Sequence, residues 1–489
     1  MKTIQIHPQD NVLVALSPLA KGEAYQDVTA LENVPQGHKM ALRDIKAGES
    51  VMKYGFPIGH ASCDIEKGAW VHTHNVKTNL AGEVEYAYQP VPTPALSADS
   101  ARTFMGYLRP DGRAAIRNEI WILPTVGCVN SVAEKLVRDN QHLVAGSVEG
   151  LYAFTHPYGC SQMGEDHENT RRLLAALCRH PNAGGVLVLS LGCENLTLEQ
   201  FQKELGAWDE NRVKFLVCQD VEDEYAEGAK LLNELAAYAA QFKREEIPAG
   251  KLVIGMKCGG SDGLSGVTAN PTVGAFSDLM IAQGGTTILT EVPEMFGAET
   301  ILMNRCVNEG IFDKSVDMIN GFKQYFIRHN QVVYENPSPG NKAGGITTLE
   351  DKSLGCVQKG GSAQVVDVIG YGEQVTVPGL NLLTGPGNDL VSATALTAAG
   401  AHLILFTTGR GTPFGAPAPT VKISTNNRLA NHKKGWIDFN AGPVAEGESI
   451  PDAGARLFAA VLEYASGRQT TSEINGCRSI AIFKGGVTL

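Results

Sequence analysis

Half of the ten cysteines in this chain directly follow a glycine: Cys128, Cys160, Cys193, Cys356 and Cys477. Another, Cys258, is followed by two glycines. Cys128, Cys160, Cys193 and Cys258 come after short apolar runs that read as strands. Open α/β sheets bind ligands at the carboxyl ends of their strands, so we predict that these four thiols are metal ligands or reactive groups. The alternative is that they are small residues that fill tight corners.

The spacing of these cysteines bears on the kind of metal site. It is not the paired C-x-x-C spacing of a structural zinc site. Widely spaced cysteines on separate loops are compatible with an iron–sulfur cluster. Helices are expected to begin shortly after Cys128 and Cys160, and a helix N-terminus modestly favours the thiolate.

Three histidines are further candidates for chemistry. His156 lies four residues before Cys160, where it reads as a base or a ligand, or alternatively as a capping or surface histidine. His72 and His74 are two residues apart. In a strand they would face the same side and could contact one ion or one anionic group.

Polar residues that could bind an anionic substrate or a hard cation gather in three glycine-rich segments. The stretch from about 336 to 361 has no periodicity, and a loop that long in a compact domain is usually functional. It and its flank contain Glu335, Asn341, Lys342 and Glu350. Arg410 lies between two glycines, which suits a bidentate grip on a carboxylate. The last pair, Ser261 and Asp262, follows Cys258 in a loop that lacks the P-loop lysine.

Composition sets limits on function. The 489 residues have a net charge of −11 without long runs of one sign, which argues against nucleic acid as a partner. No apolar run reaches the roughly 18 residues of a membrane span, and the amino terminus does not read as a signal peptide. We therefore expect a protein of the reducing cytoplasm, with its cysteines as thiols or ligands.

The pattern of elements predicts an α/β protein in three parts. Residues 1–88 read as a small β domain with a repeated D-I-x-x-G-x-x-V pattern, and residues 89–104 as a proline-rich linker. Residues 105–247 and 248–489 alternate strands and helices, as in parallel sheets. The expected elements include a helix over Leu198–Leu205 and a strand over Ser479–Phe483.

Seven sequence blocks resemble the altronate/galactarate dehydratase family of hydro-lyases. They are Pro124–Asn130, Tyr158–Gln162, Leu191–Asn195, Cys258–Gly266, Thr290–Gly297, Tyr334–Cys356 and Gly409–Gly415. The resemblance implies a β-clip (SAF-like) amino-terminal domain, a middle domain with dimer contacts, and a Rossmann-like carboxyl-terminal domain with a metal site. It also implies iron-dependent dehydration of D-altronate to 2-dehydro-3-deoxy-D-gluconate, and hence a small anionic sugar-acid substrate and a homodimer.

The roles of individual residues are our own hypotheses. We expect His156 to be the base, Glu335 and Glu350 to be acid or ligand, and Lys342 or Arg410 to hold the substrate carboxylate. Asn341, Ser261, Asp262, His72 and His74 complete the predicted substrate contacts. The metal is expected to be Fe²⁺, with Mn²⁺ as a substitute and an iron–sulfur cluster on the four cysteines as the competing interpretation. Galactarate or sulfolactate lyase activity is the alternative function, and a nicotinamide-dependent dehydrogenase is disfavoured by the missing G-x-G-x-x-G fingerprint.

Overall fold

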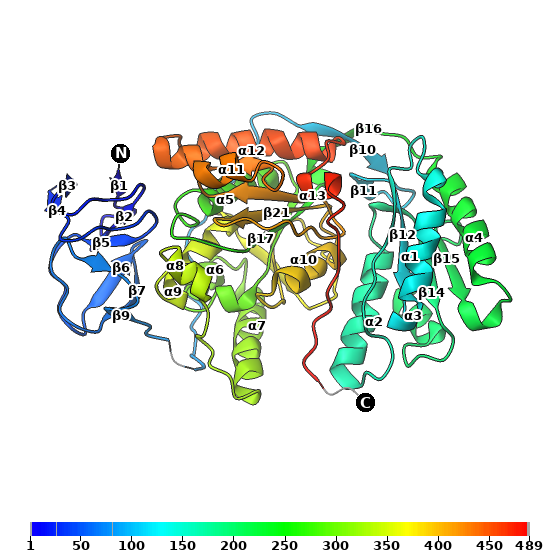
Figure 1. Cartoon of the computed structure of the whole chain (residues 1–489), viewed down its shortest axis with the longest axis horizontal. Coiled ribbons are helices and arrows are strands. Elements are labelled where there is room, and N and C mark those ends of the chain that lie inside the picture. The colour runs from blue at the N-terminus through cyan, green and yellow to red at the C-terminus, as the bar shows by residue number, and fades with distance from the viewer. Residues whose placement is uncertain (1, 26, 81, 487–489) are drawn as a thin grey trace.

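The computed structural model describes residues 2–25, 27–80 and 82–486. It has three parts in a row, and the order in space differs from the order in sequence (Figure 1). The amino-terminal β domain, in blue, lies at one end and the middle domain, in cyan and green, at the other. The carboxyl-terminal domain, in yellow and orange, lies between them, so it contacts both of the other parts.

The amino-terminal domain is built from short antiparallel strands. One sheet has the order β1 (Thr3–Ile4), β2 (Val12–Ala15), β5 (Lys39–Ala41) and β8 (Trp70–Val71). A second sheet contains β6 (Ser50–Lys53), β7 (Phe56–Ala61) and β9 (Val76–Lys77), and β3 (Ala24–Tyr25) pairs with β4 (Val28–Thr29). The two D-I-x-x-G-x-x-V copies meet through an antiparallel bridge between Ile45 and Ile65, so the repeat forms paired hairpins.

The middle domain has a parallel sheet covered by helices. Its strand order is β13 (Gly150–Ala153), β12 (Glu119–Pro124), β14 (Ala183–Ser190) and β15 (Val213–Val217). The helices are α1 (Asn130–Asp139), α2 (Gly164–Cys178), α3 (Leu198–Leu205) and α4 (Glu224–Ala239). An antiparallel sheet of β11 (Ala114–Ala115), β10 (Thr103–Leu108) and β16 (Glu245–Pro248) adjoins it.

The carboxyl-terminal domain has a seven-stranded parallel sheet. Its order is β19 (Val365–Ile369), β20 (Gly379–Leu383), β18 (Thr286–Leu289), β17 (Val253–Cys258), β21 (Leu403–Thr408), β22 (Thr420–Ser424) and β23 (Phe439–Asn440). Without the edge strand β19, this is the Rossmann order 3-2-1-4-5-6. The strand order therefore reverses at β17, and such a reversal opens a ligand-binding crevice beyond the carboxyl ends of the strands.

Helices cover both faces of this sheet. One face packs against α5 (Ala269–Ala282) and α12 (Ile450–Ala465), and the other against α10 (Asp389–Ala398). The connection from β18 to β19 is long and contains α6 (Glu299–Met303), α7 (Glu309–Arg328), α8 (Pro339–Ala343) and α9 (Leu349–Cys356). The segment expected to be one aperiodic loop thus contains two short helices.

One expected strand is wrong. Residues 479–483 are irregular rather than a strand. The backbone nitrogens of Ala481 and Phe483 donate to the side-chain oxygens of Thr394 and Tyr371, at 3.0 and 2.9 Å, instead of to a neighbouring strand. Over the described part of the chain, no helix combines the length and the apolar character that a bilayer crossing requires.

Candidate metal centre

Two thiols and one carboxylate meet in the interior of the carboxyl-terminal domain. The Cys258 sulfur lies 3.0 Å from a Glu294 carboxylate oxygen and 3.5 Å from the Cys356 sulfur, and Cys356 lies 3.3 Å from the same oxygen. All three residues are buried. Among the described residues, this is the only group of three histidine, cysteine or carboxylate ligand atoms that lie within 4.8 Å of one another.

The topology of the sheet positions this group. Cys258 is the last residue of β17, at the strand where the order reverses. Glu294 ends a 3₁₀ turn after β18, and Cys356 ends α9. The entry to the turn is fixed by Glu291, which takes a left-handed conformation with φ of +70° and accepts a 2.8 Å hydrogen bond from the Cys258 backbone nitrogen.

Buried lysines surround the group. Lys352 forms a 2.7 Å ion pair with Glu294, and Lys359 is 1% exposed beside the same carboxylate and the two thiols. Although burial opposes ionisation of Glu294, the two ammonium groups lower its pKa to about 2. The Cys356 sulfur, together with burial, raises the pKa of Cys258 well above its ordinary value. In the absence of a cation, Glu294 is therefore ionised and Cys258 is a thiol.

The donor set fits a transition-metal ion. Two sulfur ligands and one carboxylate match the softer divalent metals better than Mg²⁺, Ca²⁺ or Mn²⁺, which prefer all-oxygen sites. Binding a metal ion would deprotonate the thiols outright. Three anionic ligands are then offset by a divalent ion and two lysines, which leaves one positive charge to attract an anionic substrate.

A second charged cluster joins the amino-terminal domain to this site. Lys39 and Lys53 donate to the two carboxylate oxygens of Asp351, at 2.8 and 2.9 Å, and all three side chains are at most 2% exposed. Asp351 lies in α9, next to Lys352 and five residues before Cys356. The amino-terminal domain therefore fixes the helix that supplies one of the candidate ligands.

Several predicted substrate contacts come together beside the metal centre. Ser261 is buried, and its hydroxyl oxygen has no partner in the described structure. The Asn341 side chain donates to the Ser261 carbonyl at 2.8 Å and accepts from Lys352 at 3.2 Å. Burial raises the pKa of Asp262, which accepts from Thr425 at 2.9 Å. These residues, far apart in sequence, form one polar wall.

Two basic side chains lie at the outer edge of this wall. Arg410 is exposed and donates to the Gly340 carbonyl at 3.1 Å. Lys342 is partly buried in α8. Both residues thus lie on or beside α8, the helix that contains Asn341.

The amino-terminal histidines lie next to the same segment. His72 is buried, stacks on Trp70 with ring centroids 5.6 Å apart, and keeps one ring nitrogen unpartnered. Burial, and secondarily Lys39, lower the pKa of His72 to about 3, so this ring is neutral at physiological pH. His74 is exposed, and its ring centroid lies 5.5 Å from that of Trp70. The two histidines thus lie beside the same tryptophan but differ in burial.

Two predicted acids or ligands are not at the metal centre. The Glu350 carboxylate accepts from the Thr78 hydroxyl at 2.9 Å and the Asn79 nitrogen at 2.7 Å, so it holds the end of the amino-terminal domain. Glu335 is exposed. Neither belongs to the Cys258 group, and their predicted chemical roles have no geometric support.

His156 lies in the middle domain, away from the carboxyl-terminal sheet. It is buried, with one ring nitrogen 2.8 Å from the Pro124 carbonyl and the other accepting from the Tyr158 backbone nitrogen at 3.1 Å. Burial lowers its pKa to about 4. With both nitrogens engaged by the backbone, His156 connects two loops and is not placed to take a proton from a substrate.

The four predicted cysteine ligands separate into two places. Cys258 belongs to the buried group, whereas Cys128, Cys160 and Cys193 are exposed on the middle domain. Glu294, Lys352 and Lys359 were not predicted, because a lone glutamate or lysine carries no spacing signal. Cys356 did carry the glycine–cysteine signal but ends a helix rather than a strand.

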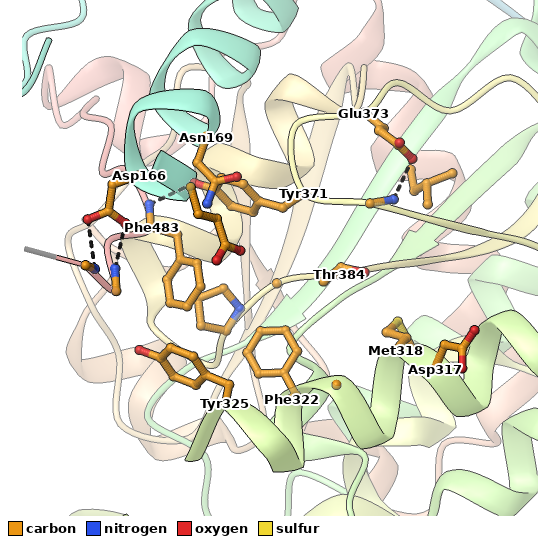
Figure 2. Close-up of a pocket in the computed structure, with 18 of the residues that line it drawn as sticks. Asp166, Asn169, Asp317, Met318, Phe322, Tyr325, Tyr371, Glu373, Thr384 and Phe483 are labelled. Atoms are coloured by element: carbon orange, nitrogen blue, oxygen red, sulfur yellow. Dashed lines mark hydrogen bonds between the residues drawn. The ribbon is translucent and has the colours of Figure 1, made fainter. Parts of the chain in front are cut away.

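Two cavities adjoin these elements. A narrow pocket of about 10 Å³, hardly larger than one water, has Ser261, Lys352 and Cys356 in its wall. A cavity of about 900 Å³ lies between α2 and α7 (Figure 2). Its wall includes the rings of Tyr325 and Phe483, and no cysteine of the described residues lines it. The large cavity nevertheless reaches the turn that carries Glu294, because Gly385 in its wall accepts from the Val292 nitrogen at 3.0 Å.

Three family models match the chain in order. Residues 1–79 match the altronate/galactarate dehydratase SAF domain. Residues 106–240 match the D-galactarate dehydratase/altronate hydrolase second domain, and residues 249–488 match the D-galactarate/altronate dehydratase C-terminal domain. Together they cover most of the sequence.

Curated relatives extend over the full length. The chain is 53% identical to altronate dehydratase of Escherichia coli over 100% of both chains, and 54% identical to altronate dehydratase of Bacillus subtilis over 99% of both. It is 34% identical to galactarate dehydratase (L-threo-forming) of Escherichia coli, over 96% of this chain and 93% of the relative. The fold and these matches define a hydro-lyase. The chain belongs to the altronate/galactarate dehydratase family.

Proposed function

We propose that this enzyme dehydrates D-altronate to 2-dehydro-3-deoxy-D-gluconate with the help of Fe²⁺. The observation that carries the substrate is the full-length identity of 53–54% to two altronate dehydratases, against 34% to a galactarate dehydratase. The buried thiol–carboxylate group at the strand reversal supports a metal-dependent reaction there.

Cys258, Glu294 and Cys356 would hold the iron. A bound Fe²⁺ supplies Lewis-acid chemistry, which stabilises negative charge on a substrate carboxylate or hydroxyl by several kcal/mol. Two thiolate ligands favour iron over the hard ions, so Mn²⁺ is the weaker substitute.

The surrounding side chains have separate tasks. Lys352 has a raised pKa because of the negative groups beside it, chiefly Glu294 and then Cys258, although burial acts against this. Its ammonium therefore keeps its proton and can stabilise negative charge that develops on a substrate oxygen by donating a hydrogen bond. The unpartnered Ser261 hydroxyl lies in the same pocket wall and can bind a substrate hydroxyl. Arg410 and Lys342, at the outer edge, would orient the substrate carboxylate.

Substrate entry requires movement. The pocket beside Cys356 has room for hardly more than a water, and its wall includes Lys53 and Tyr54 of the amino-terminal domain. We propose that part of this wall opens to admit the sugar acid and then closes over it, which would exclude water from the site.

A substrate panel tests the proposal. The purified full-length protein is incubated anaerobically with D-altronate, galactarate or sulfolactate, with and without added Fe²⁺, and 2-keto-acid formation is measured. Iron-dependent turnover of altronate in clear preference to galactarate is expected. Preference for galactarate would favour the alternative function, and altronate turnover unchanged by iron removal would contradict the metal assignment.

We also propose that the enzyme works in a reducing cytoplasm. All ten cysteines are free, and three of those on the middle domain are exposed. Exposed free thiols do not persist in oxidising compartments.

A further inference from the structure

The second set of cysteines forms a site of its own. Cys128, Cys160 and Cys193 follow β12, β13 and β14, three neighbouring strands of the middle sheet. We propose that these three thiolates hold an iron–sulfur cluster of the four-iron type, separate from the buried site around Cys258. This inference does not depend on the identity of the substrate.

Hydrogen bonds bring the three cysteine loops into direct contact. The nitrogen of Gly127, next to Cys128, donates to the Tyr158 carbonyl at 2.9 Å. The carbonyl of Gly159, next to Cys160, accepts from the Leu196 nitrogen at 3.0 Å. The Ser161 nitrogen donates to the Asn195 side chain, two residues beyond Cys193, at 2.7 Å. Each cysteine therefore lies within two residues of a bond to a neighbouring cysteine loop.

The loops are held rigidly beneath the thiols. Gly159 has φ of +96°, and a Cβ there would lie 1.9 Å from the Thr125 carbonyl oxygen, so only glycine fits. The buried Glu194 carboxylate accepts from the Thr125 hydroxyl at 2.6 Å and from the Gly192 nitrogen at 2.7 Å. Such bracing fixes ligand positions in advance, as a preformed metal site requires.

The contacts between the loops and the exposure of the thiols suit a cluster. In a four-iron cluster each cysteine binds a different iron, so the sulfurs lie farther apart than around one ion. The three sulfurs are not among the described groups that converge within 4.8 Å, although the loops that present them are in contact. All three thiols are exposed, so a cluster can be inserted without unfolding the domain.

The residues next to the three cysteines bear on which groups would contact the cluster. The Gln219 amide lies 3.5 Å from the Cys193 sulfur, and such donors stabilise a cluster sulfur. Cys218 follows the fourth strand, β15, and is only partly exposed, unlike the three proposed ligands. Three cysteine ligands leave one iron open to solvent, so the cluster should be sensitive to oxygen.

Anaerobic reconstitution of the full-length chain tests this site. The protein is treated with ferric iron, sodium sulfide and dithiothreitol, desalted, and assayed for iron, acid-labile sulfide and visible absorption. About four labile sulfides per chain and a broad band near 400 nm are expected. Cys128→Ser, Cys160→Ser and Cys193→Ser should each lose most of the sulfide.

Matched variants separate this site from the buried one. Cys258→Ser and Cys356→Ser should retain the labile sulfide, and Cys63→Ser, at an exposed cysteine of the amino-terminal domain, should behave as the wild type. Two results would overturn the proposal. One is wild-type protein that binds iron without labile sulfide, and the other is a triple Cys128/Cys160/Cys193→Ser variant that still binds sulfide. Neither result depends on altronate turnover, so a failure here is distinguishable from a failure of the proposed function.

Discussion

Replacement of Asp351 tests whether the amino-terminal domain fixes helix α9. In Asp351→Asn, two buried ammonium groups, Lys39 and Lys53, would face a neutral amide at 2.8 and 2.9 Å. Removing one partner of a buried ion pair typically costs about 3–5 kcal/mol. At about 2–4 °C per kcal/mol for a domain of this size, the thermal midpoint should fall by about 6–20 °C.

Differential scanning calorimetry at pH 7 measures this change, with Asp64→Asn as the control. Asp64 pairs with Lys46 at 2.9 Å, but the two side chains are 61% and 73% exposed. Solvent screens such surface pairs, so they contribute little to stability. A midpoint for Asp351→Asn within about 2 °C of the control would refute the reasoning.

The loss of protein stability at acid pH tests the Lys39–Asp351–Lys53 ion pairs in a second way. Against the effect of burial, Lys39 and Lys53 lower the pKa of Asp351 well below its ordinary value of 3.8. A carboxyl group whose pKa falls on folding stabilises the protein above its unfolded pKa, and that stability is lost as the pH drops from about 4 toward the folded value. The wild type should therefore lose stability below pH 4 more steeply than Asp351→Asn. Parallel acid profiles would contradict this.

Three further predictions concern the site itself. Cys356→Ser should lower the iron content of the purified enzyme at least tenfold, whereas Cys306→Ser, at a buried cysteine outside the group, should leave it unchanged; equal iron in both would exclude the assigned ligand. Lys352→Met should reduce kcat by about 10²–10³, the range for loss of one preorganised hydrogen-bond donor, and activity within threefold of wild type would exclude that role. His156→Ala should lower the thermal midpoint while the folded fraction keeps kcat within a few fold, and a loss of kcat without destabilisation would restore His156 as a base.

Local sequence signals were sufficient for much of the secondary structure. The helix expected over Leu198–Leu205 coincides with α3, whose cap Thr197 accepts from the Gln200 nitrogen. The strand expected over Ser479–Phe483 failed for a physical reason. Its alternate residues Ile480 and Ile482 are buried, as in a strand, but they pack onto the core from an irregular segment. Alternating apolar residues indicate which side chains are buried, but a segment becomes a strand only where it pairs with a neighbouring strand.

The metal centre was predictable only in part. Cys258 was found because it ends an apolar strand, and that position is readable from the sequence. Glu294 and Cys356 lie 36 and 98 residues from it, on a 3₁₀ turn and a helix. Their convergence depends on the strand order of the sheet, which no local pattern encodes. His156 was predicted as a base, but both of its ring nitrogens are bonded to the backbone. The sequence cannot show this, because it does not indicate whether the nitrogens of a histidine near a glycine–cysteine pair are free.

Cysteines adjacent to glycine thus lie at strand ends in both parallel sheets, but their surroundings differ. In the carboxyl-terminal sheet, Cys258 is buried beside Glu294, which lies next to two lysines. A divalent ion held there would leave a net positive charge that could attract an anionic substrate. In the middle sheet, Cys128 and its two neighbours are exposed and braced from below by the backbone and by Glu194, which suits a larger cofactor that carries its own sulfide. In both sheets, a cysteine adjacent to a glycine places a thiol at the end of a strand. Burial and the neighbouring charges decide which metal chemistry that thiol can support.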